Sequence, residues 1–284
     1  MRFAFTASDR YLGAIQALCS AGWEPIKLFT SPTDDRLHHN RGSIEFALAR
    51  GLPIQLSRLS ERDLAALAED GCEALVVASY PWRVPPWQSD LRYAINFHPS
   101  PLPIGRGPYP QVRALLDGHG EWGVSCHKIA PELDAGDLLG VERFALGPHE
   151  THETLDARIQ LALPSLAGAI AGDFEARWER ATPQGAGSWF PAPNDDDRTL
   201  DFDRPLEHLL RQMRAFGRLE CIATVDKLRF FVHQATGWVE PHRHRPGTLV
   251  HGTHLSMVVA VADGFLVISE WSIYPPGLPT GRRR

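Results

Sequence analysis

The first half of the chain alternates short apolar runs with segments of helical spacing, and this alternation limits the possible folds more than any other feature. Buried strands are predicted at Arg2–Phe5, Pro25–Phe29, Leu75–Ala78 and Tyr93–Phe97. Helices are predicted between them at Tyr11–Ala21, Ser43–Arg50 and Glu61–Glu69. Such alternation is typical of an α/β domain built on a Rossmann-like, mostly parallel sheet.

A change in composition near residue 182 divides the chain. Residues 182–198 are rich in Pro, Gly and Asp and predict a linker between a domain at 1–181 and a second domain at 199–284. The first domain is predicted to end in a long helix, Leu155–Phe174, kinked at Pro164. The second begins with a helix at Pro205–Ala215. Five strand-like runs follow, at Ile222–Val225, Leu228–Val232, Thr248–Val250, Met257–Val261 and Phe265–Ile268. This order favours a small, OB-like β-barrel, and residues 280–284 are predicted to be a frayed tail.

Charge and cysteine content exclude several classes of protein. The net charge of −5 gives no sign of a nucleic-acid or membrane-surface protein. No apolar stretch has the length of a signal peptide or a membrane span. The four cysteines are far apart, which disfavours a disulfide framework and a thiolate zinc site. We therefore expect a protein of the reducing cytosol.

The segment Asn96-Phe97-His98-Pro99-Ser100 lies at the end of the fourth predicted strand. Residues two apart on a strand point to the same side, so Asn96 and His98 are expected to share a face. The carboxyl end of a strand is where open α/β sheets bind their ligands. The prolines and glycines that follow, through Gly107, predict a rigid irregular loop.

A second polar segment follows a predicted strand at Gly123–His127. It reads Glu132-Leu133-Asp134-Ala135-Gly136-Asp137 and, alone, indicates no more than a turn. In this order and spacing, however, the two segments together resemble the motifs of the folate-dependent formyltransferase family. That family includes methionyl-tRNA, glycinamide ribonucleotide and amino-sugar formyltransferases.

The resemblance covers nearly the whole chain. The family motif Asn-x-His-Pro-Ser-x-Leu-Pro-x-x-Arg-Gly is matched from Asn96 to Gly107, and Ser125 stands where the second motif has Thr. By resemblance, Asn96, His98 and Asp134 are the catalytic triad, with Ser100, Arg106, Gly107 and His127 in supporting roles. The family's C-terminal domain is resembled more weakly, at Thr199–Phe202, Arg214–Phe216 and Pro246–Thr248. A formyltransferase fold with 10-formyltetrahydrofolate as co-substrate is implied.

The residue types suit that chemistry. Formyl transfer to an amine passes through a tetrahedral intermediate that carries an oxyanion, and an imidazolium and an amide are suitable donors to it. His98 would be the cation and Asn96 the amide donor. Asp134 would hold the imidazole and help to remove the amine's proton. The chemistry needs no metal.

The resemblance also implies where the folate lies. The pterin would contact the loops at Ser79–Pro85 and Ala130–Asp137, and the sequence Tyr80–Pro85 departs from the family's more aliphatic pattern. The predicted folate-contacting residues are Tyr80, Trp82, Arg83, Val84, Ala130, Leu133 and Asp137.

Other polar motifs carry less weight. His38-His39 and His242-Arg243-His244 have no ligand partners at metal spacing, so no metal is expected there. The chain has neither a dinucleotide-binding glycine motif nor a phosphate-binding Walker loop.

The acceptor amine is the open question. Residues 187–284 carry twelve Arg and Lys against eleven Asp and Glu, and the loop Thr30–Gly42 is short and mixed in charge, whereas the tRNA branch has a longer basic insertion there. Both features favour a small amine, either a nucleotide-linked amino sugar or an amino-acid or hydroxylamine side chain. A methionyl-tRNA formyltransferase, a formyl-folate hydrolase and a non-catalytic binding module remain alternatives. A homodimer is possible, and no residue pattern decides it.

Overall fold

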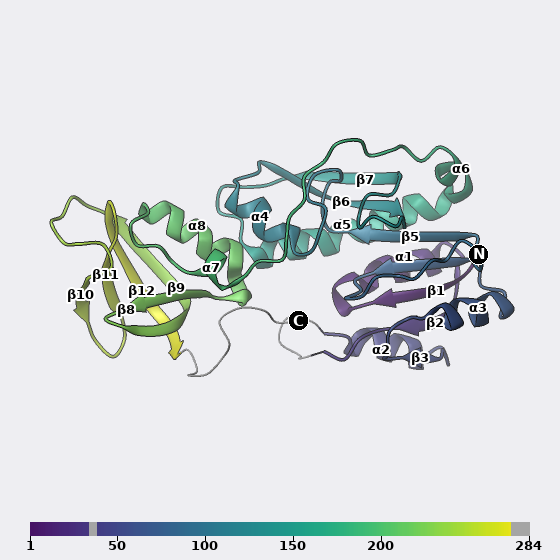
Figure 1. Ribbon diagram of the computed structural model, residues 1–284, viewed down its shortest axis with the longest axis horizontal. Coiled ribbons are helices and arrows are strands. Elements are labelled where there is room, and N and C mark those ends of the chain that lie inside the picture. Colours follow the sequence, from purple (N-terminus) through teal and green to yellow (C-terminus); the bar gives the residue numbers. More distant parts are fainter. Residues whose placement is uncertain (34–38, 274–284) are drawn as a thin grey trace. The chain divides into compact units, whose positions relative to one another are not determined.

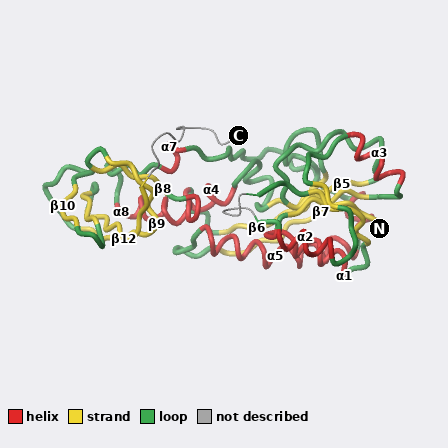
Figure 2. The backbone as a smooth tube through the Cα atoms, turned by 90° about the horizontal axis from the view of Figure 1, so that it is seen from below, coloured by secondary structure: helices red, strands yellow, loops and turns green. Residues whose placement is uncertain are grey.

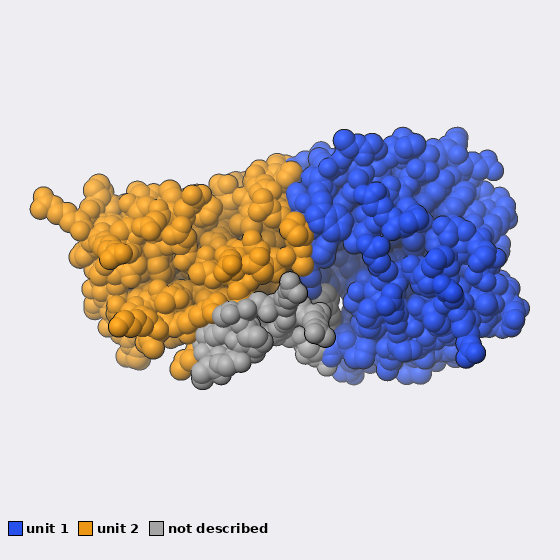
Figure 3. Space-filling view, in the orientation of Figure 1, with its two compact units in different colours: residues 1–110, 121–146, 156–190 blue, residues 111–120, 147–155, 191–284 orange. Residues whose placement is uncertain are grey.

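The protein is described by a computed structural model that covers residues 1–33 and 39–273 (Figure 1). These residues form two compact units, coloured separately in Figure 3. Unit 1 comprises residues 1–110, 121–146 and 156–190, and unit 2 comprises residues 111–120, 147–155 and the described residues from 191 onward. His38 and the predicted tail at 280–284 lie outside the described residues.

Unit 1 is built on a seven-stranded sheet with the order β3-β2-β1-β4-β5-β6-β7. The strands are β1 (Arg2–Ala7), β2 (Glu24–Phe29), β3 (Ile54–Gln55), β4 (Ala74–Ala78), β5 (Tyr93–His98), β6 (Glu121–Lys128) and β7 (Leu138–Ala145). The pairs from β3 to β5 are parallel, whereas β5–β6 and β6–β7 are antiparallel. The predicted mostly parallel, Rossmann-like sheet is confirmed.

Helices cover both faces of this sheet, and Figure 2 shows α1, α2 and α5 on one side and α3 on the other. The helices of the first half are η1 (Asp9–Tyr11), α1 (Leu12–Ser20), α2 (Arg41–Leu48), α3 (Glu61–Glu69), α4 (Pro110–Leu116), α5 (His152–Gly172) and α6 (Phe174–Glu179). Helix α3 starts at a capping box formed by Ser60 and Asp63. Its buried Leu64 and Leu67 then pack in one cluster with Leu75 of β4.

Unit 2 contains a separate five-stranded antiparallel sheet with the order β10-β11-β12-β9-β8, which is consistent with the predicted small barrel. Its elements are α7 (Asp195–Arg198), α8 (Leu206–Phe216), η2 (Gly217–Leu219), β8 (Cys221–Val225), β9 (Leu228–Val239), β10 (Leu249–Gly252), β11 (Met257–Ala260) and β12 (Gly264–Ile273). The core packs the apolar face of α8 against these strands. It includes Val112 of α4, and the partly buried Leu116 of the same helix packs against it.

No helix within residues 1–33 and 39–273 is both long and apolar enough to cross a membrane.

Candidate active site

The end of β5 places the first two polar side chains of the site. Asn96 and His98 are two residues apart and therefore lie on one face of the sheet. On the neighbouring strand β6, His127 pairs with Asn96 and Ser125 pairs with His98. Four polar residues thus occupy adjacent positions on two strands, at the end of the parallel part of the sheet.

Hydrogen bonding fixes the proton on one nitrogen of His98. Its Nε2 lies 2.8 Å from the carbonyl oxygen of Gly105, which can only accept, so Nε2 carries a hydrogen. Its Nδ1 lies 3.6 Å from Oδ1 of Asp134. Burial lowers the pKa of His98, and this effect exceeds the opposing one of the Asp134 carboxylate. Neutral His98 therefore presents the lone pair of Nδ1 beside Asp134.

Asp134 is 7% exposed and has a left-handed backbone, with φ at 54°. Its Oδ2 accepts a 2.9 Å hydrogen bond from the backbone N–H of Gly107. Burial alone would raise the pKa of Asp134, yet His98, His127 and that N–H together hold it down to about 2. Asp134 is therefore a carboxylate at neutral pH.

His127 connects Asn96 to this carboxylate. Its Nδ1 lies 2.7 Å from the carbonyl oxygen of Lys128, so Nδ1 carries a hydrogen. Its Nε2 lies 3.0 Å from Nδ2 of Asn96 and 3.6 Å from Oδ1 of Asp134. The Asn96 amide also donates to Oδ1 of Asp134 at 3.4 Å. The structure therefore brings together the three predicted triad residues and the predicted support His127.

Two side chains of β6 hold the proline-rich loop after β5. The indole N–H of Trp122 donates to the carbonyl oxygen of Pro99 at 2.9 Å, and the Ser125 hydroxyl makes two further hydrogen bonds. Ser125 Oγ donates to the carbonyl oxygen of Ser100 at 2.7 Å and accepts from the N–H of Leu102 at 3.0 Å. Ser125 stands where the family motif has Thr, and its hydroxyl makes both of these contacts. Ser100, predicted as a support, is fully buried, and its carbonyl oxygen makes the contact. Its own hydroxyl has no hydrogen-bond partner among the described residues.

Residues 184–190 are part of the site, which the sequence analysis did not predict. Ser188 Oγ accepts a 2.8 Å hydrogen bond from the N–H of Gly105, and the N–H of Phe190 donates to the carbonyl oxygen of Arg106 at 2.7 Å. Phe190 is buried and its ring is parallel to that of Trp122 to within 10°. The amide of Gln184 joins Arg106 to the Asp134 loop. In the sequence, the only sign of these contacts is a Gln and an aromatic pair, Trp189 and Phe190, within a turn-rich stretch.

The residues predicted to contact folate lie on two loops with different surroundings. Tyr80 accepts a 2.6 Å hydrogen bond from the N–H of Leu59, and Trp82 packs edge-on against the Tyr80 ring. Val84 is partly buried on the core beneath, and Arg83 is exposed. On the second loop, Ala130 is half-buried, Leu133 is 40% exposed, and the Asp137 carboxylate pairs with Lys128 at 3.3 Å. Partly open apolar side chains on both loops fit a flat aromatic ring such as a pterin.

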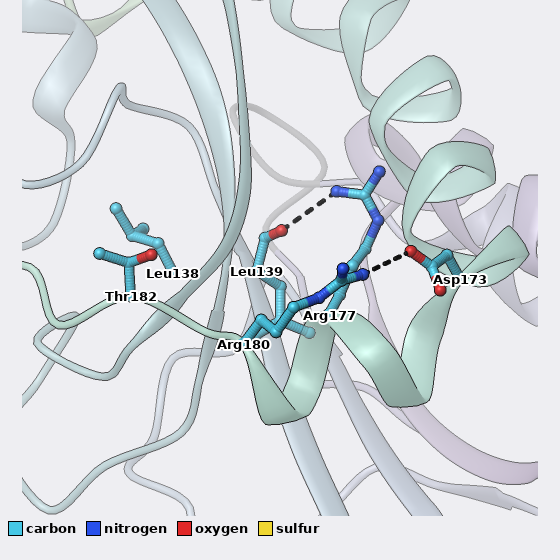
Figure 4. A pocket seen from close by; sticks show the side chains of 6 residues that line it. All are labelled: Leu138, Leu139, Asp173, Arg177, Arg180 and Thr182. Atoms are coloured by element: carbon cyan, nitrogen blue, oxygen red, sulfur yellow. Dashed lines mark hydrogen bonds and ion pairs between the residues drawn. The ribbon is translucent and has the colours of Figure 1, made fainter.

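A surface pocket of about 290 Å³ lies elsewhere in unit 1 and shares no residue with this cluster (Figure 4). Each of the two arginines that line this pocket already interacts with a neighbouring residue. Arg177 donates to the carbonyl oxygen of Leu139 at 3.3 Å, and Arg180 pairs with Asp173 at 3.0 Å. The lining residues are Leu138, Leu139, Asp173, Arg177, Arg180 and Thr182.

In the described part of the chain, no group of three or more His, Cys, Asp or Glu side chains is placed to hold a metal.

A buried imidazole–carboxylate pair beside an amide donor, at the end of a central strand of a Rossmann-like sheet, is the arrangement of an acyl-transfer enzyme. Two family models match the chain: "Formyl transferase" over residues 30–166 and "Formyl transferase, C-terminal domain" over residues 194–273. The chain is 31% identical to the methionyl-tRNA formyltransferase of Thermus thermophilus, across 84% of this chain and 77% of that protein. The chain belongs to the formyltransferase family.

Solved structures share the fold. An N-formyltransferase from Helicobacter canadensis, crystallised with folinic acid and dTDP-3-aminofucose, superposes with a TM-score of 0.68. The two are 14% identical, and the match covers 95% of this chain and 99% of that one. HypX from Aquifex aeolicus, in complex with tetrahydrofolic acid, superposes with a TM-score of 0.66 at 18% identity. That match covers 97% of this chain but only 44% of HypX, so this chain corresponds to less than half of that protein.

Proposed function

We propose that this protein transfers the formyl group of 10-formyltetrahydrofolate to the amine of a small molecule, through Asn96, His98 and Asp134. The observation that carries the proposal is the buried contact of His98 with Asp134, 3.6 Å apart, beside the Asn96 amide. Membership of the formyltransferase family supports the reaction type.

In the proposed reaction the acceptor nitrogen attacks the formyl carbon, and the carbonyl oxygen becomes an oxyanion. The Asn96 amide lies 3.0 Å from His127 Nε2 and makes a longer, 3.4 Å contact with Asp134, and the N–H of this longer contact turns to the oxyanion. The His98 imidazolium, once formed, also stabilises the oxyanion. His98 Nδ1 gains its proton from the attacking amine, and Asp134 stabilises the resulting cation. The bond from the formyl carbon to folate N10 then breaks, and the proton passes to N10.

Folate is proposed to lie against the loops at residues 79–85 and 130–137. Leu133 on one loop and Val84 on the other present apolar surface that a pterin ring would cover. The folate ligands in the Helicobacter canadensis and HypX structures support the same co-substrate.

A small acceptor is favoured because residues 187–284 are nearly balanced in charge and several cations of the protein are paired internally. In unit 2, Arg198 and Arg229 pair with Asp195, and Arg214 pairs with Glu207. In unit 1, Arg41 pairs with Glu45, and the Arg50 guanidinium lies 3.8 Å from the centre of the Phe46 ring. A surface that grips the phosphates of tRNA needs cations that are available to them. The candidate acceptors are nucleotide-linked amino sugars and the side chains of amino acids or hydroxylamines.

Methionyl-tRNA is the second candidate acceptor. The relative from Thermus thermophilus is a methionyl-tRNA formyltransferase, and the match to it covers most of both chains. The test offers the protein 10-formyltetrahydrofolate with either charged initiator methionyl-tRNA or a panel of amino sugars and amino acids, at physiological salt. We expect a formylated small amine. Formylation of the tRNA alone would overturn the proposal. Tetrahydrofolate release without a formylated amine would identify a hydrolase, and no release at all would identify a binding module.

The chain organisation proposed with this function is a catalytic domain at 1–181 and an acceptor-facing domain at 199–284, joined through 182–198. The contacts of Gln184, Ser188 and Phe190 with the catalytic loops support adding 184–190 to the catalytic domain.

We place the protein in the reducing cytosol. All four cysteines, which are Cys19, Cys72, Cys126 and Cys221, are free thiols in the structure.

A further inference from the structure

The backbone of Asp134 needs an outside restraint. A left-handed φ of 54° is unfavourable for a residue with a Cβ. Two residues on, a Cβ at Gly136 would clash with the carbonyl oxygen of Lys128, so the loop turns close to the end of β6. The carboxylate must nonetheless stay between two imidazoles. A specific contact is therefore expected to hold this turn.

Gln184 makes that contact. Its side-chain nitrogen donates to the carbonyl oxygens of Asp134, at 2.9 Å, and Gly136, at 2.6 Å. Its side-chain oxygen accepts from Nε of Arg106 at 2.9 Å. Because carbonyls only accept and a guanidinium only donates, the opposite orientation of the amide would lose all three bonds.

These bonds close a circuit around Asp134. The N–H of Gly107 holds its carboxylate, and the neighbouring Arg106 holds its main chain through Gln184. Arg106 is itself fixed, since its Nη2 donates to the carbonyl oxygen of Gly185 at 2.9 Å. Two contacts therefore join the Gly105–Gly107 loop to the Asp134 loop. One is the hydrogen bond from Gly107 to the Asp134 carboxylate, and the other is the bridge through Gln184.

We propose that Gln184 is a positioning residue for the formyl-transfer site, which sets the place of the Asp134 carboxylate relative to His98 by bridging Arg106 to the main chain of residues 134–136. Gln184 is only 9% exposed, so it acts through Asp134 rather than on a substrate. The inference rests on the proposed function only for the expected loss of turnover. The expected displacement of the Asp134 carboxylate from His98 does not depend on which reaction the protein catalyses.

The test replaces Gln184 with Met, which keeps its length and removes all three hydrogen bonds, and with Glu, which keeps the acceptor for Arg106 and loses the two donors. Unit 2 supplies a matched control. Gln212 is also buried, and its side-chain nitrogen donates to the carbonyl oxygens of Asp197, at 2.9 Å, and Thr199, at 3.1 Å. Gln212→Met therefore removes an equivalent pair of bonds within unit 2.

The first readout is the titration of His98, followed by NMR of the histidine rings and identified with His98→Gln. The groups that face His98 are Asp134 and His127, together with the Gly105 carbonyl. If Gln184 positions Asp134, Gln184→Met shifts the His98 titration to lower pH, because the carboxylate that favours the imidazolium is displaced. In Gln184→Glu the added carboxylate opposes that shift. Gln212→Met leaves the titration unchanged. An unaltered His98 titration in folded Gln184→Met overturns the proposal.

The second readout is turnover of 10-formyltetrahydrofolate with hydroxylamine as the acceptor probe. We expect kcat to fall about 10- to 100-fold in both Gln184 variants with KM for the folate little changed, as misplacement of a catalytic group predicts. Equal loss of activity in Gln212→Met would reduce the effect to general destabilisation and contradict the proposal. A wild-type protein without transferase activity would defeat the proposed function, whereas the His98 titration would still decide the role of Gln184.

Discussion

At the scale of single residues, the buried pair of His98 and Asp134 determines the protonation state of the site. His98 is 6% exposed and Asp134 is 7% exposed, so neither charge is well hydrated. The pKa of the Asp134 carboxyl is held low by the positive charge of the two imidazoles in their protonated forms, by a contact with His127 and by a backbone N–H. The imidazole stays neutral at rest because burial outweighs the attraction of the carboxylate. A neutral base beside a fixed anion suits the removal of a proton from an amine.

This arrangement predicts the titration of His98. Its pKa lies below the ordinary 6.5, so the neutral form increases as pH rises and predominates at pH 7. Asp134→Asn removes the favourable charge and should lower the pKa further, whereas desolvation is unchanged. The histidine ring signals in NMR report both values. A titration above 6.5 in the wild-type protein would contradict this account.

The triad residues should each be required for turnover. Asn96→Ala, His98→Ala and Asp134→Ala remove an oxyanion donor, the proton acceptor and its counter-charge, so each should lower kcat by about 100-fold or more. Circular dichroism and thermal unfolding serve as controls for the fold. Near-normal turnover in any one variant, with a formylatable amine present, would remove that residue from the mechanism.

At the scale of elements, period-2 alternation was sufficient to place Asn96 and His98 at the end of β5. It could not place Asp134 beside them, because residues 129–137 form an irregular loop whose course depends on Gly136 and on Gln184. Strand β7 and helix α6 were not predicted: β7 carries charged residues such as Glu142 and Arg143, and α6 has only six residues. Residues 184–190 were assigned to a linker because their composition is that of turns, whereas their backbone pairs with the catalytic loop.

The contact between this segment and the loop after β5 should not tolerate a side chain at Gly107. Its φ is +100°, and a Cβ there would meet the carbonyl oxygen of Phe190 at 2.5 Å. Gly107→Ala should therefore displace the N–H that holds Asp134, and lower both thermal stability and kcat.

Gly168→Ala is the matched control for this substitution. Gly168 lies within α5, and nothing lies within 4 Å of the position of its added Cβ. Since Ala favours helix over Gly by roughly 0.5–1 kcal/mol, this variant should be as stable as wild type or more so. Equal stability of Gly107→Ala and wild type would show that the two segments are not in firm contact.

At the scale of the whole molecule, the two compact units do not follow the order of the chain. Helix α4 belongs to the sequence of the first half, yet Val112, 1% exposed, lies in the core of unit 2 with residues of β8, β9 and β12. A boundary drawn from composition cannot detect this, because the apolar side of a short helix gives no sign of the core that it enters.

Val112→Ala should therefore destabilise unit 2 rather than the seven-stranded sheet. Loss of two buried methyl groups costs on the order of 1–3 kcal/mol. Native-state hydrogen exchange should become faster in β8 and β9 and stay unchanged in β1 and β4. Unchanged protection of β8 and β9 would show that α4 is not part of that core.

The position of α4 also has a consequence for biogenesis. Val112 and Leu116 emerge from the ribosome well before α8 and the strands β8 to β12, which supply most of the core cluster that Val112 belongs to and Leu116 packs against. At about 5–20 residues per second, the interval from residue 116 to residue 268 lasts roughly 8–30 s. During that interval the apolar side of α4 lacks its core partners, which makes the nascent chain a substrate for chaperones. A translation product that stops before residue 200 never covers it, so truncated chains should be aggregation-prone even though all strands of the seven-stranded sheet have been made.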